Sequence, residues 1–215
     1  MDSAQLRKRI PYEEFDYQQL LECLSGYRQP RAKISALLKS GMIVRVKKGI
    51  YVFGEGFRRT PVSREILANL IYGPSYISLD YALQLHGLIP ERVEELTSVC
   101  LGRTRSFETP LGRFSYRRLS LVKYRGGVLR SELPDGRAYL LASPEKALLD
   151  KLHTERGLGI RTQSELRGYL ASSLRIEDSE LQQLNTGLIN GLARQSRSRL
   201  GRLLQAVVTQ MQREQ

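Results

Sequence analysis

The sequence predicts an α+β protein in which a small N-terminal domain of helices and a hairpin precedes a larger α/β domain. Three observations support this class. Helical patterns and a hairpin signal occupy residues 4–53, β-prone runs fill much of residues 94–141, and an amphipathic helical pattern fills the end of the chain. The larger domain is therefore expected to hold an antiparallel sheet flanked by helices, followed by a helical C-terminus.

Three short helices are predicted near the N-terminus, over residues 4–10, 16–24 and 30–40. Asp16 suits the N-cap of the second helix, Pro30 the first turn of the third, and Gly41 the end of the third. The sequence MIVRVKKGIYVF then contains two β-prone runs that meet at Lys47-Lys48-Gly49, which predicts a hairpin. Three helices followed by a hairpin are the plan of a winged helix-turn-helix, which we expect over residues 1–57.

The second domain is expected over residues 61–215, because the polar connector EGFRRTP separates it from the first. Its predicted helices cover residues 63–71, 79–87 and 144–153, and Ser78 and Ser143 are expected to cap the last two. Leu200, Leu203, Leu204, Val207, Val208 and Met211 form an apolar stripe at helical spacing. The stripe is expected to pack on the sheet of residues 94–141 or, alternatively, on a second chain.

The charge of the chain indicates a polyanionic partner. Lys and Arg number 34 against 22 Asp and Glu, a formal net charge of +12. Such an excess favours nucleic acid, an acidic protein or an anionic membrane as partner. Residues 1–60 carry 12 basic and 6 acidic side chains, so half of the excess lies in the first quarter of the chain. With no signal peptide and no apolar run of about 20 residues, a cytoplasmic protein with no membrane partner is expected.

The third predicted helix and the hairpin form the expected surface for double-stranded DNA. If Ile34 faces the core, the opposite face of the helix carries small and polar residues that can approach base edges in the major groove. The alternative to DNA binding is that this polar face is only solvated and that the domain interacts with another protein. The predicted DNA contacts are Arg28, Gln29, Arg31, Ala32, Lys33, Ser35, Ala36 and Lys39 on the helix side, and Arg45, Lys47 and Lys48 on the hairpin.

A second basic region lies in the predicted sheet, where eight cations stand against the single acid Glu108. Phe107, Phe114 and Tyr116 interleave with them. Aromatic and basic strands can stack single-stranded nucleic acid, but alternation along one strand favours core aromatics with a basic outer face. That face would extend the DNA contact or receive an acidic protein. Its cations are Arg103, Arg105, Arg113, Arg117, Arg118, Lys123, Arg125 and Arg130.

Catalytic, metal and cofactor sites are not expected. His86 and His153 each fall in the last turn of a predicted helix, where the helix dipole explains them. Cys23 and Cys100 match buried small apolar residues rather than a disulfide or a metal pair. Residues 157–159 form a GxG pattern without the rest of a nucleotide-binding motif. Glu145-Lys146 at the start of a predicted helix is better explained by the helix dipole than by a nuclease site. A nuclease would need clustered carboxylates for Mg²⁺, and the acids show no such pattern.

Three segments resemble AbiEi-type antitoxins of bacterial type IV toxin–antitoxin, or abortive infection, systems. PRAKISALLKSGMIVRVKKGIYVFG is similar to the winged-helix segment of that family. YISLDYALQLHGLIPERVEELTSVCLGRTRSFETPLGRFSYRRL resembles its helix–sheet core, and SPEKALLDKL its following helix. The resemblance covers about two-thirds of the chain, from Tyr27 to Leu152, and identifies residues 61–215 as the antitoxin's C-terminal domain.

The resemblance implies a DNA-binding transcriptional autorepressor that binds inverted repeats in its operator and helps defend against phage. The C-terminal domain would counter a cognate nucleotidyltransferase-like toxin without forming a stable complex with it. The DNA contacts carried over are Arg31, Lys33, Lys39, Arg45, Lys47 and Lys48. Two alternatives stay open: a stand-alone winged-helix regulator without a toxin, and a DNA-processing enzyme.

Overall fold

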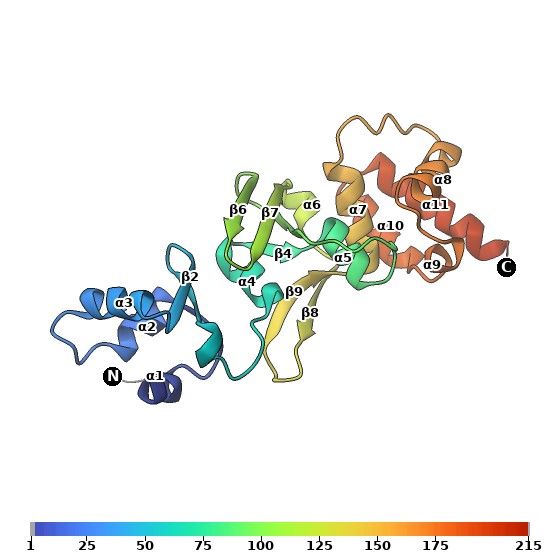
Figure 1. Ribbon diagram of the computed structural model, residues 1–215. Helices are drawn as coiled ribbons and strands as arrows, with labels where there is room; N and C mark the ends of the chain where they lie inside the picture. The colour runs from blue at the N-terminus through green and yellow to red at the C-terminus, as the bar shows by residue number, and fades with distance from the viewer. Residues whose placement is uncertain (1–2, 215) are drawn as a thin grey trace. The chain divides into compact units, whose positions relative to one another are not determined.

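The computed structural model describes residues 3–214 and has an α+β fold (Figure 1). The chain forms two compact units: a first unit up to Ile71 that includes Thr109–Leu111, and a second unit of Tyr72–Glu108 and Gly112–Gln215. The expected boundary at residues 57–61 therefore falls inside the first unit.

The first unit combines helices with a small sheet around one apolar core. Its elements are α1 (Ser3–Arg9), β1 (Glu14–Asp16), α2 (Tyr17–Cys23), α3 (Pro30–Lys39), β2 (Ile43–Lys47), β3 (Ile50–Phe53), the 3-10 helix η1 (Glu55–Phe57) and α4 (Arg64–Ile71). The strands form an antiparallel sheet in the order β1-β3-β2. Leu6, Phe15 and Phe53 are among its fully buried core residues. Strand β1 was not predicted, because three residues carry no detectable alternation.

Local signals set the ends of these helices as expected. Asp16 caps α2 in a capping box: its carboxylate accepts from the Gln19 backbone N–H at 2.9 Å, and the Gln19 side chain accepts from the Asp16 N–H. Pro30 is in the first turn of α3, and Gly41 after its end has a φ of 69°. Gly49 turns the hairpin between β2 and β3 with a φ of 91°. The predicted helix–helix–helix–hairpin order is thus present in the chain.

The polar connector is part of the first unit because a buried ion pair holds it. Arg7 on α1 pairs with Glu13, both side chains being at most 4% exposed, and Arg7 Nε also donates to the Phe57 carbonyl at 2.9 Å. Glu13 accepts from the backbone N–H groups of Arg59 and Thr60 at 2.9 and 3.1 Å. Burial alone would raise the pKa of Glu13, but these hydrogen bonds lower it. Composition alone marked residues 55–61 as a linker and gave no sign of this acceptor.

The second unit is built on a six-stranded sheet in the order β6-β7-β5-β4-β9-β8. The strands are β4 (Ser75–Ile77), β5 (Leu96–Cys100), β6 (Arg105–Thr109), β7 (Gly112–Arg118), β8 (Val128–Glu132) and β9 (Ala138–Ala142). The sheet is mixed: β4 pairs with β9, and β5 with β7, in parallel. The expectation of an antiparallel sheet was therefore wrong, because alternation identifies a strand without showing which neighbour it pairs with or in which direction.

Helices complete the second unit: α5 (Leu79–Leu85), α6 (Leu121–Tyr124), α7 (Pro144–Thr154), α8 (Gln163–Ser172), α9 (Asp178–Gln182), α10 (Thr186–Gln195) and α11 (Arg199–Arg213). Helix α7 contacts α5 and β9 on one side and α10 and α11 on the other, so it joins the sheet to the C-terminal helices (Figure 1). Ser143 caps α7, its hydroxyl accepting from the Lys146 N–H at 3.2 Å. Ser78 precedes α5 but makes no cap hydrogen bond.

The apolar stripe of the last helix faces other helices rather than the sheet. Leu204, Val207, Val208 and Met211 are buried, and α11 contacts α10, α8, α9 and α7. The expected packing against the sheet was wrong, since helical periodicity shows that a face is buried without showing against what. Among residues 3–214, no helix combines the length and the apolar character needed to cross a bilayer.

Candidate nucleic-acid interface

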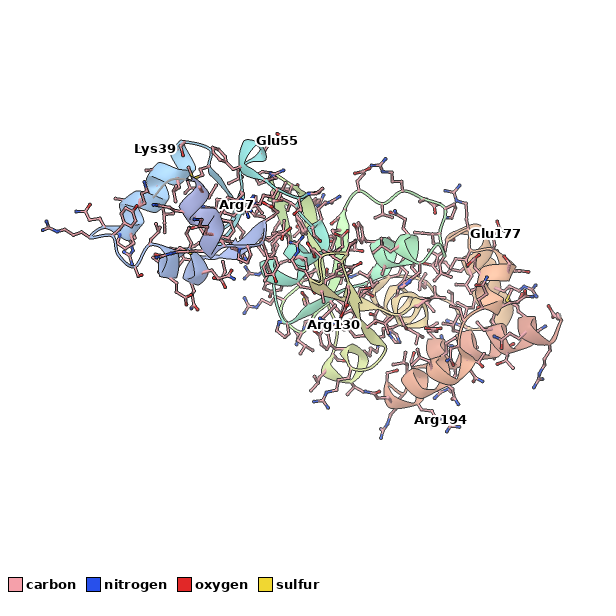
Figure 2. The ribbon with its side chains drawn as sticks, turned by 90° about the horizontal axis from the view of Figure 1, so that it is seen from below. Arg7, Lys39, Glu55, Arg130, Glu177 and Arg194 are labelled. Carbon is pink, nitrogen blue, oxygen red and sulfur yellow. The ribbon has the colours of Figure 1, made fainter. Side chains whose placement is uncertain are left out.

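Helix α3 divides into a buried side and an open, cationic side. Ile34 and Leu37 are buried in the core of the first unit. Arg31, Ala32, Ser35, Ala36 and Lys39 are exposed, and successive steps of 100° place them on one face. Figure 2 shows Lys39 at the end of this helix. The small side chains of Ala32, Ser35 and Ala36 leave the backbone of this face approachable.

The cations beside this face are unpaired. Arg28 and Gln29 precede α3 and are exposed, as are Arg45 on β2 and Lys48 in the hairpin turn. Within residues 3–214, the side chains of Arg28, Arg31, Lys39, Arg45 and Lys48 make no ion pair or hydrogen bond. A set of exposed cations without local acids is what a polyanion would neutralise.

Two of the predicted DNA contacts, Lys33 and Lys47, have side chains that already contact other residues of the first unit. Lys47 is half-buried, and its ammonium donates to the carbonyl of Ile71, the last residue of α4, at 2.6 Å. Lys33 is also half-buried, and its Nζ lies 5.7 Å from the ring centroid of Tyr27. Both ammonium groups are thus directed back onto the unit. The register shift between Arg45 and Lys47 in β2 separates the exposed Arg45 from the engaged Lys47.

The second basic region is dispersed by the fold. Arg113 is ion-paired with Glu95 and Glu108 at 3.4 and 3.2 Å, and Arg130 with Glu132. Arg105 lies over the Tyr72 ring at 5.8 Å. Lys123 is half-buried. Arg117 and Arg118 are exposed on β7, and Arg103 and Arg125 are exposed outside the strands and helices. The second region thus contains ion-paired cations, whereas Arg28, Arg31, Lys39, Arg45 and Lys48 have no ion pair among the described residues.

Two of the three aromatic residues of that region belong to the core, and the third, Phe107, is half-buried. Phe114 and Tyr116 are fully buried on one face of β7, and Tyr116 packs against Tyr72 and Phe107 with centroids 5.3 and 5.8 Å away. This confirms the interpretation of core aromatics over that of a stacking platform, because fully buried rings cannot stack on bases. Arg113 and Arg117 occupy the opposite face of the same strand.

A buried polar cluster centred on Asp150 was missed by sequence reasoning. Lys146 and Asp150, one turn apart on α7, form an ion pair with side chains 2% and 0% exposed. Asp150 also accepts from the hydroxyls of Tyr76 and Ser78, each at 2.8 Å, and Lys146 donates to the Lys123 carbonyl at 2.8 Å. Burial raises the pKa of Asp150 and lowers that of Lys146, and the ion pair opposes both shifts.

Glu145 lies in the first turn of α7, as expected from the helix dipole, and both Glu145 and Lys146 also make buried contacts that the sequence did not predict. Glu145 is 6% exposed and accepts from the Asn185 backbone N–H at 2.9 Å, which ties the start of α7 to the start of α10. The spacing of Lys146 and Asp150 at i and i+4 was a usable signal. The burial of these two residues could not be predicted from the sequence, because it depends on packing against β4 and the loop before α5.

The histidines and cysteines are bound into the structure. His86 Nε2 lies 2.8 Å from the Ala142 carbonyl, and His153 Nε2 lies 2.7 Å from Ser198 Oγ. Burial, with Lys123 and Lys146 nearby, lowers the pKa of His153 to about 4, so the ring is neutral and does not complement the helix dipole as a cation. Cys23 and Cys100 are buried and free, as expected. Residues 3–214 contain no group of three or more His, Cys, Asp or Glu arranged to hold a metal.

Comparisons with known proteins show a likeness to a solved structure. No family model matches the chain, and no curated protein matches its sequence. Among solved structures, the chain is similar to the crystal structure of the RV2827C protein from Mycobacterium tuberculosis, with a TM-score of 0.48 and 16% sequence identity. That match covers 94% of this chain and 78% of the other.

Proposed function

We propose that the protein is a DNA-binding transcriptional autorepressor of the winged helix-turn-helix class, and an antitoxin that counters a nucleotidyltransferase-like toxin. In this proposal α3 enters the major groove and the β2–β3 hairpin is the wing. The observation that carries the DNA-binding part is the face of α3, which joins small residues and unpaired cations opposite a buried apolar side.

The contacts within the first unit sort the proposed DNA contacts into two groups. Arg31, Lys39, Arg45 and Lys48 are exposed and unpaired, so a phosphate or a base edge can take them without breaking an existing bond. Lys33 and Lys47 would first have to leave Tyr27 and the Ile71 carbonyl. We therefore place the main electrostatic contact on the first group, which refines the residue set expected from the sequence.

The test is binding of the full chain to a labelled duplex taken from directly upstream of its gene, with a shuffled duplex as competitor. The logarithm of affinity should fall linearly with the logarithm of salt concentration, by about 0.9 for each phosphate neutralised. Lys48→Ala should flatten that slope by about one phosphate, and Lys47→Ala should flatten it less. Lys8→Ala on α1 removes an equal exposed charge and is the matched control. A salt-independent affinity, or equal slopes for all variants, would rule out the proposed interface.

The antitoxin part has a separate test. The neighbouring genes are searched for a nucleotidyltransferase-like protein, any such protein is co-expressed with the whole chain, and growth is followed; the absence of such a gene would count against the antitoxin role. We expect growth to be restored both by the native chain and by the Arg31→Ala, Lys39→Ala double variant, because the proposed neutralisation belongs to the second unit. Failure of both chains to restore growth would leave the stand-alone regulator as the better description.

A further inference from the structure

A polar groove in the second unit is not used by the proposed DNA interface. It has a volume of about 480 Å³ and lies where the start of α5, strands β5 and β7, and the end of α7 come together. Leu79 at its edge has a φ of 62°, which a residue with a side chain adopts only when its surroundings enforce it. The groove is lined by Leu79, Asp80, Glu95, Thr97, Ser115, Arg117, Lys151, Thr154, Glu155 and Arg156.

Every carboxylate in the groove already has a cationic partner. Lys151 pairs with Asp80 at 2.9 Å and with Glu155 at 2.8 Å, and its side chain is only 17% exposed. Glu95 pairs with Arg113 at 3.4 Å. Burial works against the charge on Lys151, but its hydrogen bonds to Glu155 and Asp80 prevail and raise its pKa. These pairs fix the walls of the groove, although Lys151 is shared between Asp80 and Glu155, and Arg113 between Glu95 and Glu108.

Two arginines that line the groove have no acidic partner among the described residues. Arg117 extends from β7 on the same face as Ser115, and Arg156 follows the end of α7; both are exposed. Among the described residues, neither guanidinium makes an ion pair or a hydrogen bond. A guanidinium presents a planar fork of donors that matches a phosphate group, and two of them at one groove make an anion-binding end.

A second hollow, which we call the apolar hollow after four of its side chains, adjoins the polar groove. It has a volume of about 280 Å³ and shares Asp80, Lys151 and Glu155 with the polar groove. The rest of its lining is Ile89, Val93, Leu174, Tyr169, Ser173 and Glu91, and Glu91 is ion-paired with Arg175. The Tyr169 hydroxyl donates to Glu155 at 3.1 Å, so its ring is held at the junction. A ligand that covers both hollows needs an anionic end and a flat apolar end, with hydroxyls between them for the shared carboxylates.

We propose that this groove binds a nucleotide, with its phosphate on Arg117 and Arg156, its ribose hydroxyls at the shared carboxylates, and its base against the apolar hollow. A nucleoside monophosphate has these three parts in this order. The combined volume is in the range of small-molecule sites, about 300–1,000 Å³. All lining residues belong to the second unit, so the site does not depend on DNA binding by α3.

The experiment is calorimetric titration of the full chain with each of the four common ribonucleoside 5′-monophosphates, adenosine, and inorganic phosphate. At least one monophosphate should bind, and adenosine and phosphate should each bind more weakly. Arg117→Gln and Arg156→Gln should each weaken that binding by about 10- to 100-fold, the effect of losing a hydrogen bond to a charged group. Arg118→Gln, the next residue of the same strand, removes an equal exposed charge outside the groove and should leave the affinity within about twofold.

Three results would overturn the site. They are no binding of any monophosphate at millimolar concentration, equal weakening by Arg117→Gln and Arg118→Gln, and binding of inorganic phosphate as tight as that of the nucleotides. The last result would reduce the site to an anion site. Thermal melting of each variant checks that it folds, and upstream-DNA binding by Arg117→Gln checks that the two functions are separate. Loss of nucleotide binding with DNA binding intact is the expected pattern.

Discussion

Helices α3 and α7 begin alike but differ in where they place their charged side chains. Each has Pro in its first turn, spans ten or eleven residues and carries a basic residue in its last turn. Helix α3 buries only Ile34 and Leu37, and it exposes the cations Arg31 and Lys39. Helix α7 buries seven residues, three of which are the charged Glu145, Lys146 and Asp150.

The difference lies in where the partners of the charges come from. The charged residues of α7 meet groups brought by β4, by the loop before α5 and by the start of α10. The exposed cations of α3, Arg31 and Lys39, make no ion pair or hydrogen bond within residues 3–214. A charge that the fold satisfies stabilises the fold, whereas a charge that it leaves open is available to a partner. Four measurements test this contrast.

The largest expected effect is on the side of α7. Asp150→Ala removes one partner of a fully buried ion pair and leaves Lys146 charged in the core, with Tyr76 and Ser78 unpaired. We expect a loss of about 3–5 kcal/mol in the free energy of unfolding, measured by urea denaturation. Arg31→Ala on α3 is the control and should change this quantity by less than about 0.5 kcal/mol. A loss below about 1 kcal/mol for Asp150→Ala would show that the buried charge is compensated elsewhere.

The second effect compares His153 in the last turn of α7 with Lys39 in the last turn of α3. Burial lowers the pKa of His153 to about 4, against 6.5 for a free histidine, whereas Lys39 is exposed. The unfolded chain therefore takes up a proton before the folded chain does. This contribution to stability is complete above pH 6.5 and is lost as pH falls towards 4, by about 3 kcal/mol over the window. His153→Gln should flatten the pH dependence of unfolding in that window, and an unchanged profile would show that His153 titrates normally.

The third effect appears only with DNA. Arg31→Ala or Lys39→Ala should weaken binding to the upstream duplex by about 1–3 kcal/mol if the residue contacts a base edge, with little change on shuffled DNA. Competition titrations at fixed salt measure both quantities. Equal losses on the two duplexes would assign the residue to phosphate contact, and Lys8→Ala provides the baseline for a lost surface charge.

The smallest effect compares how the two helices begin. Ser143 caps α7 through its hydroxyl, whereas Gln29 at the start of α3 makes no side-chain cap. Ser143→Ala should lower the free energy of unfolding by about 1 kcal/mol. Gln29→Ala has no cap to lose and should leave stability nearly unchanged. Similar losses in the two variants would mean that Gln29 caps α3 in solution.

Much of the local structure was predictable from neighbouring residues. Asp16 with Gln19, Pro30 with Gly41, and Ser143 with Pro144 each act over a few positions, so their signals are present in the sequence itself. The exposed face of α3 followed from the same helical spacing, and so did the buried stripe of α11. These features depend on the geometry of one element alone, which is why composition and spacing locate them.

The remaining features depend on partners far apart along the chain. Ser78, whose hydroxyl donates a hydrogen bond to Asp150, lies 72 residues from it in the sequence. Ile71, whose carbonyl accepts a hydrogen bond from Lys47, lies 24 residues from it. The adjacent Arg117 and Arg118 differ only in which side of β7 they occupy, and one of them lines the groove while the other does not. The direction of strand pairing and the partners of α11 are settled in the same way. Packing brings these groups together, and no pattern within a single element records which of them will meet.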